Sequence, residues 1–286
     1  DIVAGSAQKF RSETTPNGRV IRSYGMSFVN RIVTAATEID PRFVRDLHAG
    51  PSSPPNFTYS LFLKDSDSRR AGDIAVFGIL SSSVPAMAAQ SNSSWLFEQP
   101  APFTYPVYWP DGDKLRAVEP FITSAQQQRD VLRQPALRDA WYEHMSREDG
   151  FFGSQTFGFP LLDISPFARL VRRTLAISSI DRAKSRILKG TEYPYAEVLR
   201  LMIVTFAERA RADGQIPVVF LIQSRDARDV DLLSIAHSTL VENNIDYVAT
   251  AEIVDPRDRS LFLLDSHYKP EIDKLFAQRF VDLMKF

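Results

Sequence analysis

The 286-residue sequence contains no cysteine, which excludes disulfide bonds, thiolate metal sites and a cysteine nucleophile. It also contains no run of about 18 or more apolar residues, the length that a membrane-spanning helix requires. Charge of one sign does not dominate either, since 34 Lys and Arg residues face 35 Asp and Glu residues, for a net charge of -1. This balance argues against broad electrostatic binding to nucleic acid.

Phosphate-binding glycine loops are missing as well. Neither a GxGxxG pattern after the first expected strand nor a GxxxxGK[ST] pattern occurs, which disfavours a doubly wound nucleotide enzyme. The chain opens at Asp1-Ile2-Val3 without an initiator methionine or a signal-peptide pattern, so we expect a mature or trimmed form. With 44% hydrophobic and 24% charged residues, the composition is that of an ordinary globular protein.

Apolar strand-like runs alternate with helical patterns along much of the chain. Helical spacing begins at Ser27 and stops at Pro41, and a last helix begins at Pro270. Strands that are apolar nearly throughout and separated by helices predict an α/β fold with a parallel sheet covered on both faces. Catalytic and binding residues of such sheets lie at the carboxyl ends of the strands. We expect about five strands, near residues 20–26, 56–62, 73–80, 216–222 and 246–250.

The middle of the chain, roughly 95–190, breaks this pattern. We interpret it as a long insertion or cap within a single domain spanning 1–286, with helices over 125–147 and 166–189. Before these helices lies a loop rich in proline and aromatic residues, in which Tyr105, Tyr108 and Trp109 are candidates for stacking on sugar rings or acyl chains. A hydrophobic flap is the alternative. We interpret the Asp-Gly-Asp sequence at 111–113 as a turn and not as a calcium site.

Ser27 is the first candidate for chemistry. It follows Tyr24-Gly25-Met26 at the end of the first expected strand and opens a helix. This position places the hydroxyl at the sheet edge, beside backbone N–H groups and the positive end of a helix dipole. The alternative is that Ser27 only caps the helix N-terminus, a role that serine performs well.

His267 is the second candidate, in a loop before the last helix. Asp265, two residues earlier, is suited to hold the imidazole in one tautomer and to stabilise the imidazolium. A surface Asp-x-His pair without a role is the alternative. Of the other histidines, His144 and His237 sit in helical patterns and are expected to be structural, whereas His48 stays open.

Taken together, the two blocks resemble the SGNH (GDSL-like) hydrolase superfamily. The first block reads Gly25-Met26-Ser27 and the last reads Asp265-Ser266-His267, in the order that the family uses for its nucleophile and for its aspartate and histidine. The resemblance covers both ends of the chain, roughly 20–90 and 215–286. It implies a flavodoxin-like three-layer α/β/α sandwich, with Ser27, His267 and Asp265 as a catalytic triad and with no metal or organic cofactor.

The blocks between these two depart from the family pattern. The resemblance implies that Gly50, which precedes the expected strand at 56–62, is the counterpart of the family's oxyanion-hole glycine and that its N–H acts together with the N–H of Ser27. No asparagine follows the strand at 73–80, where Ser81 and Ser82 stand as replacement donors. Met26 replaces the family's aspartate. Because loss of one oxyanion donor costs on the order of 10²–10³ in turnover, these departures put ordinary esterase efficiency in doubt.

The function implied is that of a serine esterase acting on O-acyl, mainly O-acetyl, esters of carbohydrate through an acyl-Ser27 intermediate. The partner expected is therefore an acylated small molecule or glycan, with no nucleic acid, and an extracytoplasmic location is favoured. Two alternatives stay open: an O-acyltransferase that modifies a cell-surface polysaccharide, and a non-catalytic SGNH-like module that binds a glycan or a protein partner. The sequence does not indicate the oligomeric state.

Overall fold

The computed structural model describes residues 8–11, 18–49, 53–96, 104–153, 165–226 and 228–285. The chain divides into two compact units. We call Ala7–Val84 together with Leu199–Phe286 the sheet unit, and Pro85–Val198 the middle unit. In sequence the middle unit interrupts the sheet unit once, and each unit is described by itself below.

The sheet unit is built on a six-stranded sheet with the order β1-β3-β2-β4-β7-β8. Five neighbouring strands run parallel, whereas β1 at the edge pairs antiparallel with β3. Numbered along the chain, the parallel strands have the spatial order 2-1-3-4-5 of flavodoxin-like sheets. The strands are β1 (Gln8–Arg11), β2 (Arg19–Gly25), β3 (Phe43–Ala49), β4 (Ile74–Leu80), β7 (Ile216–Ile222) and β8 (Asp246–Ala249).

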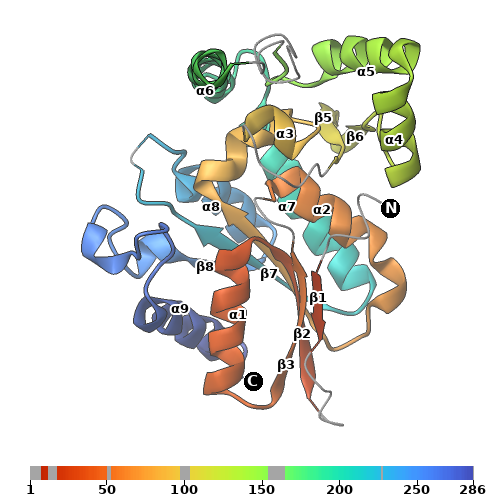
Figure 1. Ribbon diagram of the computed structural model, residues 1–286. Helices are drawn as coiled ribbons and strands as arrows, with labels where there is room; N and C mark the ends of the chain where they lie inside the picture. Colours follow the sequence, from red (N-terminus) through yellow and green to blue (C-terminus); the bar gives the residue numbers. More distant parts are fainter. Residues whose placement is uncertain are drawn as a thin grey trace. The chain divides into compact units, whose positions relative to one another are not determined.

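Helices cover both faces of this sheet (Figure 1). One face carries α1 and α9, which lie side by side and share an apolar core with the sheet. The other face carries α2 and α7, where the rings of Phe62 and Phe206 lie 4.7 Å apart, and α8 packs against β7 and β8. The α/β class and the flavodoxin-like three-layer sandwich predicted from the sequence are therefore confirmed. These helices are α1 (Ser27–Ile39), α2 (Pro55–Lys64), α7 (Tyr195–Ala212), α8 (Leu232–Glu242) and α9 (Pro270–Leu283).

Two features of the sheet unit differ from the sequence prediction. The expected strand at 56–62 is wrong, because these residues form α2, with Pro55 in the first turn, where a missing N–H removes no helix hydrogen bond. Every residue from Pro55 to Phe62 is buried, so no amphipathic spacing marks the helix in the sequence. The strand beside β2 is instead β3, whose pattern is obscured by the buried polar residues Asp46 and His48.

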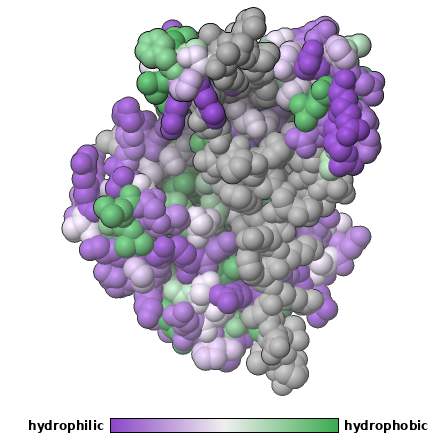
Figure 2. All heavy atoms as spheres, viewed as in Figure 1, coloured by the Kyte–Doolittle hydropathy of each residue, from purple (hydrophilic) through white to green (hydrophobic). Residues whose placement is uncertain are grey.

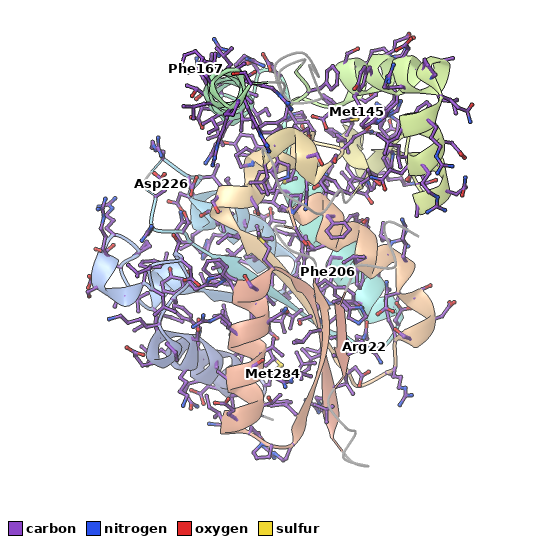
Figure 3. All side chains as sticks on the ribbon, in the orientation of Figure 1. Arg22, Met145, Phe167, Phe206, Asp226 and Met284 are labelled. Carbon is purple, nitrogen blue, oxygen red and sulfur yellow. The ribbon has the colours of Figure 1, made fainter. Side chains whose placement is uncertain are left out.

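A buried ion-pair cluster explains the polar residues of these strands. Arg22 of β2 is only 2% exposed, and Figure 3 shows it beside the strands of the sheet unit. Its guanidinium donates to Asp46 of β3 at 2.6 Å and to Asp73, just before β4, at 3.2 Å. Removing one partner of such a buried pair costs about 3–5 kcal/mol, because the other charge is left without compensation. Arg22 therefore ties three neighbouring strands together at the amino half of the sheet.

The middle unit contains one hairpin and four helices among its described residues. The predicted turn at 111–113 is confirmed, since Gly112 joins the two antiparallel strands with a positive φ of 62°. The elements are α3 (Asn92–Trp95), β5 (Val107–Asp111), β6 (Lys114–Val118), α4 (Ala125–Arg133), α5 (Pro135–Glu148) and α6 (Pro166–Leu188). Four 3₁₀ segments complete the described chain: η1 (Ser66–Ser68), η2 (Ser81–Ala88), η3 (Thr250–Glu252) and η4 (Arg259–Leu261).

The carboxylate of Asp149 organises the interior of the middle unit. It accepts hydrogen bonds from the backbone N–H groups of Gln90 and Phe151 and from the Ser94 hydroxyl, each at 2.8 Å. Burial raises the pKa of Asp149 to about 6, and the hydrogen bonds from these donors act in the opposite direction. One buried side chain thus satisfies donors from three separate turns of the chain.

Candidate active site

Ser27 lies where the sheet changes its winding direction. It follows β2, and the neighbours of β2 are β3 on one side and β4 on the other, so connections leave this point in opposite directions. In open α/β sheets this switch point, outside the carboxyl ends of the strands, is where ligands bind. Met26 is the N-cap of α1 and makes no side-chain cap hydrogen bond. Ser27 is therefore the first helical residue and not the cap, and its side chain is exposed.

Two glycines allow α1 to approach the sheet closely at this point. A Cβ atom added to Gly25 of β2 would lie 2.5 Å from Cγ2 of Val29, and one added to Gly78 of β4 would lie 2.0 Å from the same atom. Real Cβ atoms do not approach other atoms so closely. Val29 fills the space above both glycines, so the first turn of α1, which carries Ser27, is seated directly on the switch point.

His267 meets Ser27 from the opposite end of the sequence. Its Nε2 lies 2.6 Å from Oγ of Ser27, within hydrogen-bond distance, although 240 positions separate the two residues. The imidazole also stacks on the ring of Phe28, with centroids 4.4 Å apart and an interplanar angle of 23°. The His267 carbonyl accepts a hydrogen bond from the backbone N–H of Leu263 at 2.7 Å, which closes the loop before α9.

Asp265 contacts His267 in two ways. Its Oδ1 accepts the backbone N–H of His267 at 3.1 Å, and its Oδ2 lies 3.1 Å from Nδ1 of the ring. The two groups are in contact, but Nδ1 has no hydrogen-bond partner in the described part of the chain. The hydrogen bond from the His267 backbone lowers the pKa of Asp265, whose side chain is largely exposed to solvent. Between the two residues, Ser266 adopts a left-handed backbone with φ of 72°.

A second set of contacts holds the histidine loop, and sequence reasoning missed it. Arg31, one helical turn after Ser27, donates to Oδ2 of Asp273 at 2.7 Å and to the carbonyl oxygen of Tyr268 at 2.8 Å. The Tyr268 hydroxyl donates to the carbonyl of Gln223, just after β7, at 2.6 Å. Desolvation by burial raises the pKa of Tyr268 to about 12. Ser27 and Arg31 are four residues apart, so both lie on the same helix face. This spacing was the signal in the sequence that could have pointed to Arg31 as a neighbour of the site.

The predicted oxyanion donors differ in their exposure and in their hydrogen-bond partners. The Ser27 N–H lies in the first turn of α1, where N–H groups have no acceptor within the helix. Gly50 lies outside the described residues. Ser81 is fully buried, and its Oγ accepts the N–H of Ser224 at 2.9 Å, which joins the ends of β4 and β7. Ser82 is partly exposed at the carboxyl end of β4.

The predicted aromatic platform belongs to the middle unit and is mostly interior. Tyr105 is fully buried, with its hydroxyl accepting from Nε1 of Trp95 at 2.9 Å. Tyr108 is also buried, and its carbonyl accepts from the hydroxyl of Tyr193 at 2.8 Å. Trp109 is partly exposed and packs edge-on against Tyr193. The expectation that Tyr105 and Tyr108 present ring faces to a sugar is therefore wrong, because these rings form the core of the middle unit.

The remaining histidines have structural surroundings. His48 is buried, stacks on Tyr24 with centroids 4.9 Å apart, and lies 3.3 Å from a carboxylate oxygen of Asp65. His144 pairs through Nε2 with the side-chain oxygen of Gln90 at 2.8 Å, and desolvation lowers the pKa of His144. His237 is exposed on α8. Across the ranges that the structure describes, no group of three or more His, Asp or Glu side chains is placed to hold a metal ion.

Neither a protein-family model nor a curated protein nor a solved structure matches this chain. The resemblance to SGNH hydrolases therefore stays an inference from the two sequence blocks. In the part of the chain that is described, none of the helices has both the length and the apolar content that crossing a bilayer requires.

Proposed function

We propose that the chain is a serine esterase in which Ser27 is the nucleophile and His267 its general base. The observation that carries this proposal is the 2.6 Å separation between Oγ of Ser27 and Nε2 of His267 at the switch point of a flavodoxin-like sheet. A nucleophile within hydrogen-bond reach of a base, which a carboxylate contacts in turn, is the arrangement of acyl-transfer enzymes on unrelated folds.

The reaction proceeds in two balanced steps. First, the Ser27 oxygen attacks the ester carbonyl as Nε2 of His267 takes the hydroxyl proton, and His267 returns that proton to the departing alcohol. Second, water attacks the acyl-Ser27 ester as Nε2 of His267 takes a proton from it, and His267 then returns that proton to Oγ of Ser27 as the carboxylic acid leaves. The positive end of α1 and the Ser27 N–H favour the oxyanion in both steps, and Ser82 is the side chain best exposed to assist.

The surroundings of Ser27 support an ester of a polar, hydroxyl-rich molecule. An open groove of about 250 Å³ begins at Asn30, one helical turn after Ser27, and runs between α1 and α9. Arg31, Glu38 and Lys274 contribute charged groups to its lining. Such donors and acceptors suit sugar hydroxyls better than a long acyl chain, which supports a carbohydrate O-acetyl ester as the substrate.

Labelling with a fluorophosphonate probe tests the nucleophile directly. Peptide mass spectrometry is expected to locate the probe on Ser27, and Ser27→Ala and His267→Gln are expected to abolish labelling. Ser238→Ala, at another exposed serine, is the matched control and is expected to label normally. Labelling that survives in Ser27→Ala, or that never occurs in the folded protein, contradicts the proposal and favours a non-catalytic binding module.

The fate of the acyl group separates hydrolysis from transfer. Incubation with an activated acetyl ester and a glycan acceptor is expected to release free acetate at the same rate with and without the glycan. Accumulation of acetylated glycan at the expense of acetate, lost in Ser27→Ala, would instead identify a carbohydrate O-acyltransferase that uses the same acyl-Ser27 intermediate.

A further inference from the structure

Among the described residues, the exposed large hydrophobic side chains are concentrated on one helix. Of the nine large hydrophobic side chains that are exposed in the described part of the chain, five lie on α6 of the middle unit. Phe167 is 75% exposed and Leu170 is 60% exposed, and the other three are Val171, Leu175 and Ile177. Single exposed hydrophobic residues are normal on a protein surface, but a cluster of this kind marks an interaction site.

These residues occupy one side of the helix. Leu170 and Val171 follow Phe167 by three and four positions, and the same spacing leads on through Thr174 to Ile177. These side chains therefore lie along one stripe of the helix. The side that faces the protein is different, since the buried residues of α6 are Ala176, Ala183 and Ile187. Figure 2 shows the apolar surface at the place that α6 occupies in Figure 1, and Phe167 is labelled there in Figure 3.

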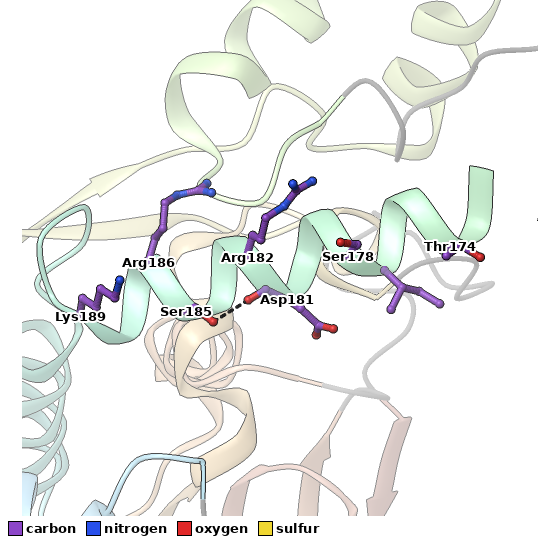
Figure 4. Close-up of a pocket in the computed structure, with 8 residues that line it drawn as sticks. Thr174, Ser178, Asp181, Arg182, Ser185, Arg186 and Lys189 are labelled. Atoms are coloured by element: carbon purple, nitrogen blue, oxygen red, sulfur yellow. Dashed lines mark hydrogen bonds between the residues drawn. The ribbon is translucent and has the colours of Figure 1, made fainter. Parts of the chain in front are cut away.

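Positive charge accompanies the apolar stripe. Between Pro166 and Leu188 the helix has six Arg and Lys residues and one acidic residue, in a chain whose net charge is -1. The same stripe becomes polar in its second half, where Arg182, Arg186 and Lys189 line an open groove of about 580 Å³. Figure 4 shows the side chains of Arg182 and Arg186 extending from the same side of the helix.

We propose that α6 docks on an anionic phospholipid surface, with Phe167, Leu170 and Val171 inserted at the acyl boundary and the basic residues at the headgroup phosphates. A helix with an apolar face flanked by Arg and Lys lies in the plane of a bilayer interface, and anionic lipid strengthens its binding. A second copy of the chain fits this face poorly, because it would bring two strongly basic helices together. The proposal does not depend on the chemistry of Ser27.

Sedimentation with lipid vesicles tests this docking surface. The full chain is expected to bind vesicles that contain about one third phosphatidylglycerol in phosphatidylcholine and to bind pure phosphatidylcholine at least tenfold more weakly. The double variant Phe167→Ser/Leu170→Ser is expected to lose binding to both. Leu264→Ser, at a fully exposed leucine of the sheet unit, is the matched control and is expected to bind as the wild type does.

Variants that remove single basic residues, and a check that each variant is folded, complete the experiment. Arg173→Gln and Arg182→Gln are each expected to weaken binding to anionic vesicles about fivefold, whereas Arg257→Gln in the sheet unit is expected to have no effect. Circular dichroism melts establish that each variant is folded. Equal binding to neutral and anionic vesicles, or no binding to either, overturns the proposal. So does a dimer in light scattering that dissociates in Phe167→Ser/Leu170→Ser, because a second copy then occupies the face.

Discussion

Arg31 of α1 and Asp273 of α9 form the closest ion pair between the helix that begins with Ser27 and the helix that follows His267. Their Nε and Oδ2 atoms lie 2.7 Å apart, and the Asp273 side chain is only 5% exposed. Desolvation raises the pKa of Asp273, and the hydrogen bond from Arg31 works against this shift. The same guanidinium reaches the Tyr268 carbonyl, so one side chain fixes both helices and the residue next to His267.

Arg31→Lys is expected to reduce acylation of Ser27 about tenfold to a hundredfold. Lysine keeps the charge but cannot contact Asp273 and the Tyr268 carbonyl together, so the histidine loop loses its fixed position. The initial rate of fluorophosphonate labelling measures this effect. Lys285→Gln, which removes the exposed ion pair with Asp282, is the control and is expected to label normally. Equal rates for Arg31→Lys and the wild type would show that Arg31 has no positioning role.

Gly78→Ala is expected to lower the free energy of unfolding by about 1–3 kcal/mol and to slow labelling of Ser27. The new methyl group would meet Cγ2 of Val29 at 2.0 Å, and relief of that contact requires the first turn of α1 to move off the sheet. Urea unfolding measures the loss of stability, and the probe rate measures the displacement of Ser27.

The double variant Gly78→Ala/Val29→Ala isolates this steric cause. Removing the valine methyl groups opens space for the new Cβ, so the double variant is expected to be more stable than the sum of the two single changes predicts. Additive losses within about 0.5 kcal/mol would mean that the two residues do not compete for the same volume.

The meeting of Ser27 and His267 at the switch point could be predicted from the sequence, whereas the elements around it could be predicted only in part. Ser27 and His267 carry recognisable blocks, and the apolar runs of β2, β4, β7 and β8 match their expected positions. The misassigned segment at 56–62 has β-branched and aromatic residues, yet complete burial on the sheet face overrides that propensity. The spacing from Ser27 indicated only that Arg31 lies on the same helix face, because the role of Arg31 depends on Asp273, a partner 242 positions away.

Asp265→Asn is expected to slow acylation only about tenfold, far less than the roughly 10⁴-fold loss seen when a buried triad aspartate is replaced. The carboxylate is exposed, and its contact with Nδ1 of His267 is not a directed hydrogen bond. The hydrogen bond from the His267 backbone N–H lowers the pKa of Asp265 from the ordinary value of an aspartate, so this carboxylate is ionised at neutral pH. An acid limb at higher pH in the rate profile therefore belongs to another group. A loss of 10³-fold or more in Asp265→Asn would contradict this view.

The stability of the middle unit is expected to fall as the pH rises from about 4 to about 6. Burial raises the pKa of Asp149 from 3.8 to about 6, so between these values the folded state holds a proton that the unfolded state has released. Proton binding then favours folding at low pH, and this contribution, about 3 kcal/mol, is lost as the pH passes 6. An NMR titration of the Asp149 carboxyl carbon measures the pKa of Asp149 in the folded state. Denaturant unfolding at several pH values measures the accompanying change in the free energy of unfolding.

Asp149→Asn and Asp139→Asn form the matched pair for this titration. Asp149→Asn is expected to flatten the pH dependence of unfolding between pH 4 and 6, as the titrating group is gone. Asp139 is exposed on α5, so Asp139→Asn is expected to leave the dependence as in the wild type. A carboxyl resonance of Asp149 that titrates near pH 4 would remove the basis of the prediction.

The backbone at Ser266 bears on how relatives of this protein can be found in genomes. At φ of 72°, Ser266 lies in a region that Gly, Asn and Asp enter readily and that Val and Ile avoid. The turn it makes brings the Asp265 carboxylate back toward the imidazole two residues on. A search pattern that requires a small or short polar residue between the aspartate and histidine, and rejects branched ones, should separate chains that keep this turn from chance Asp-x-His matches.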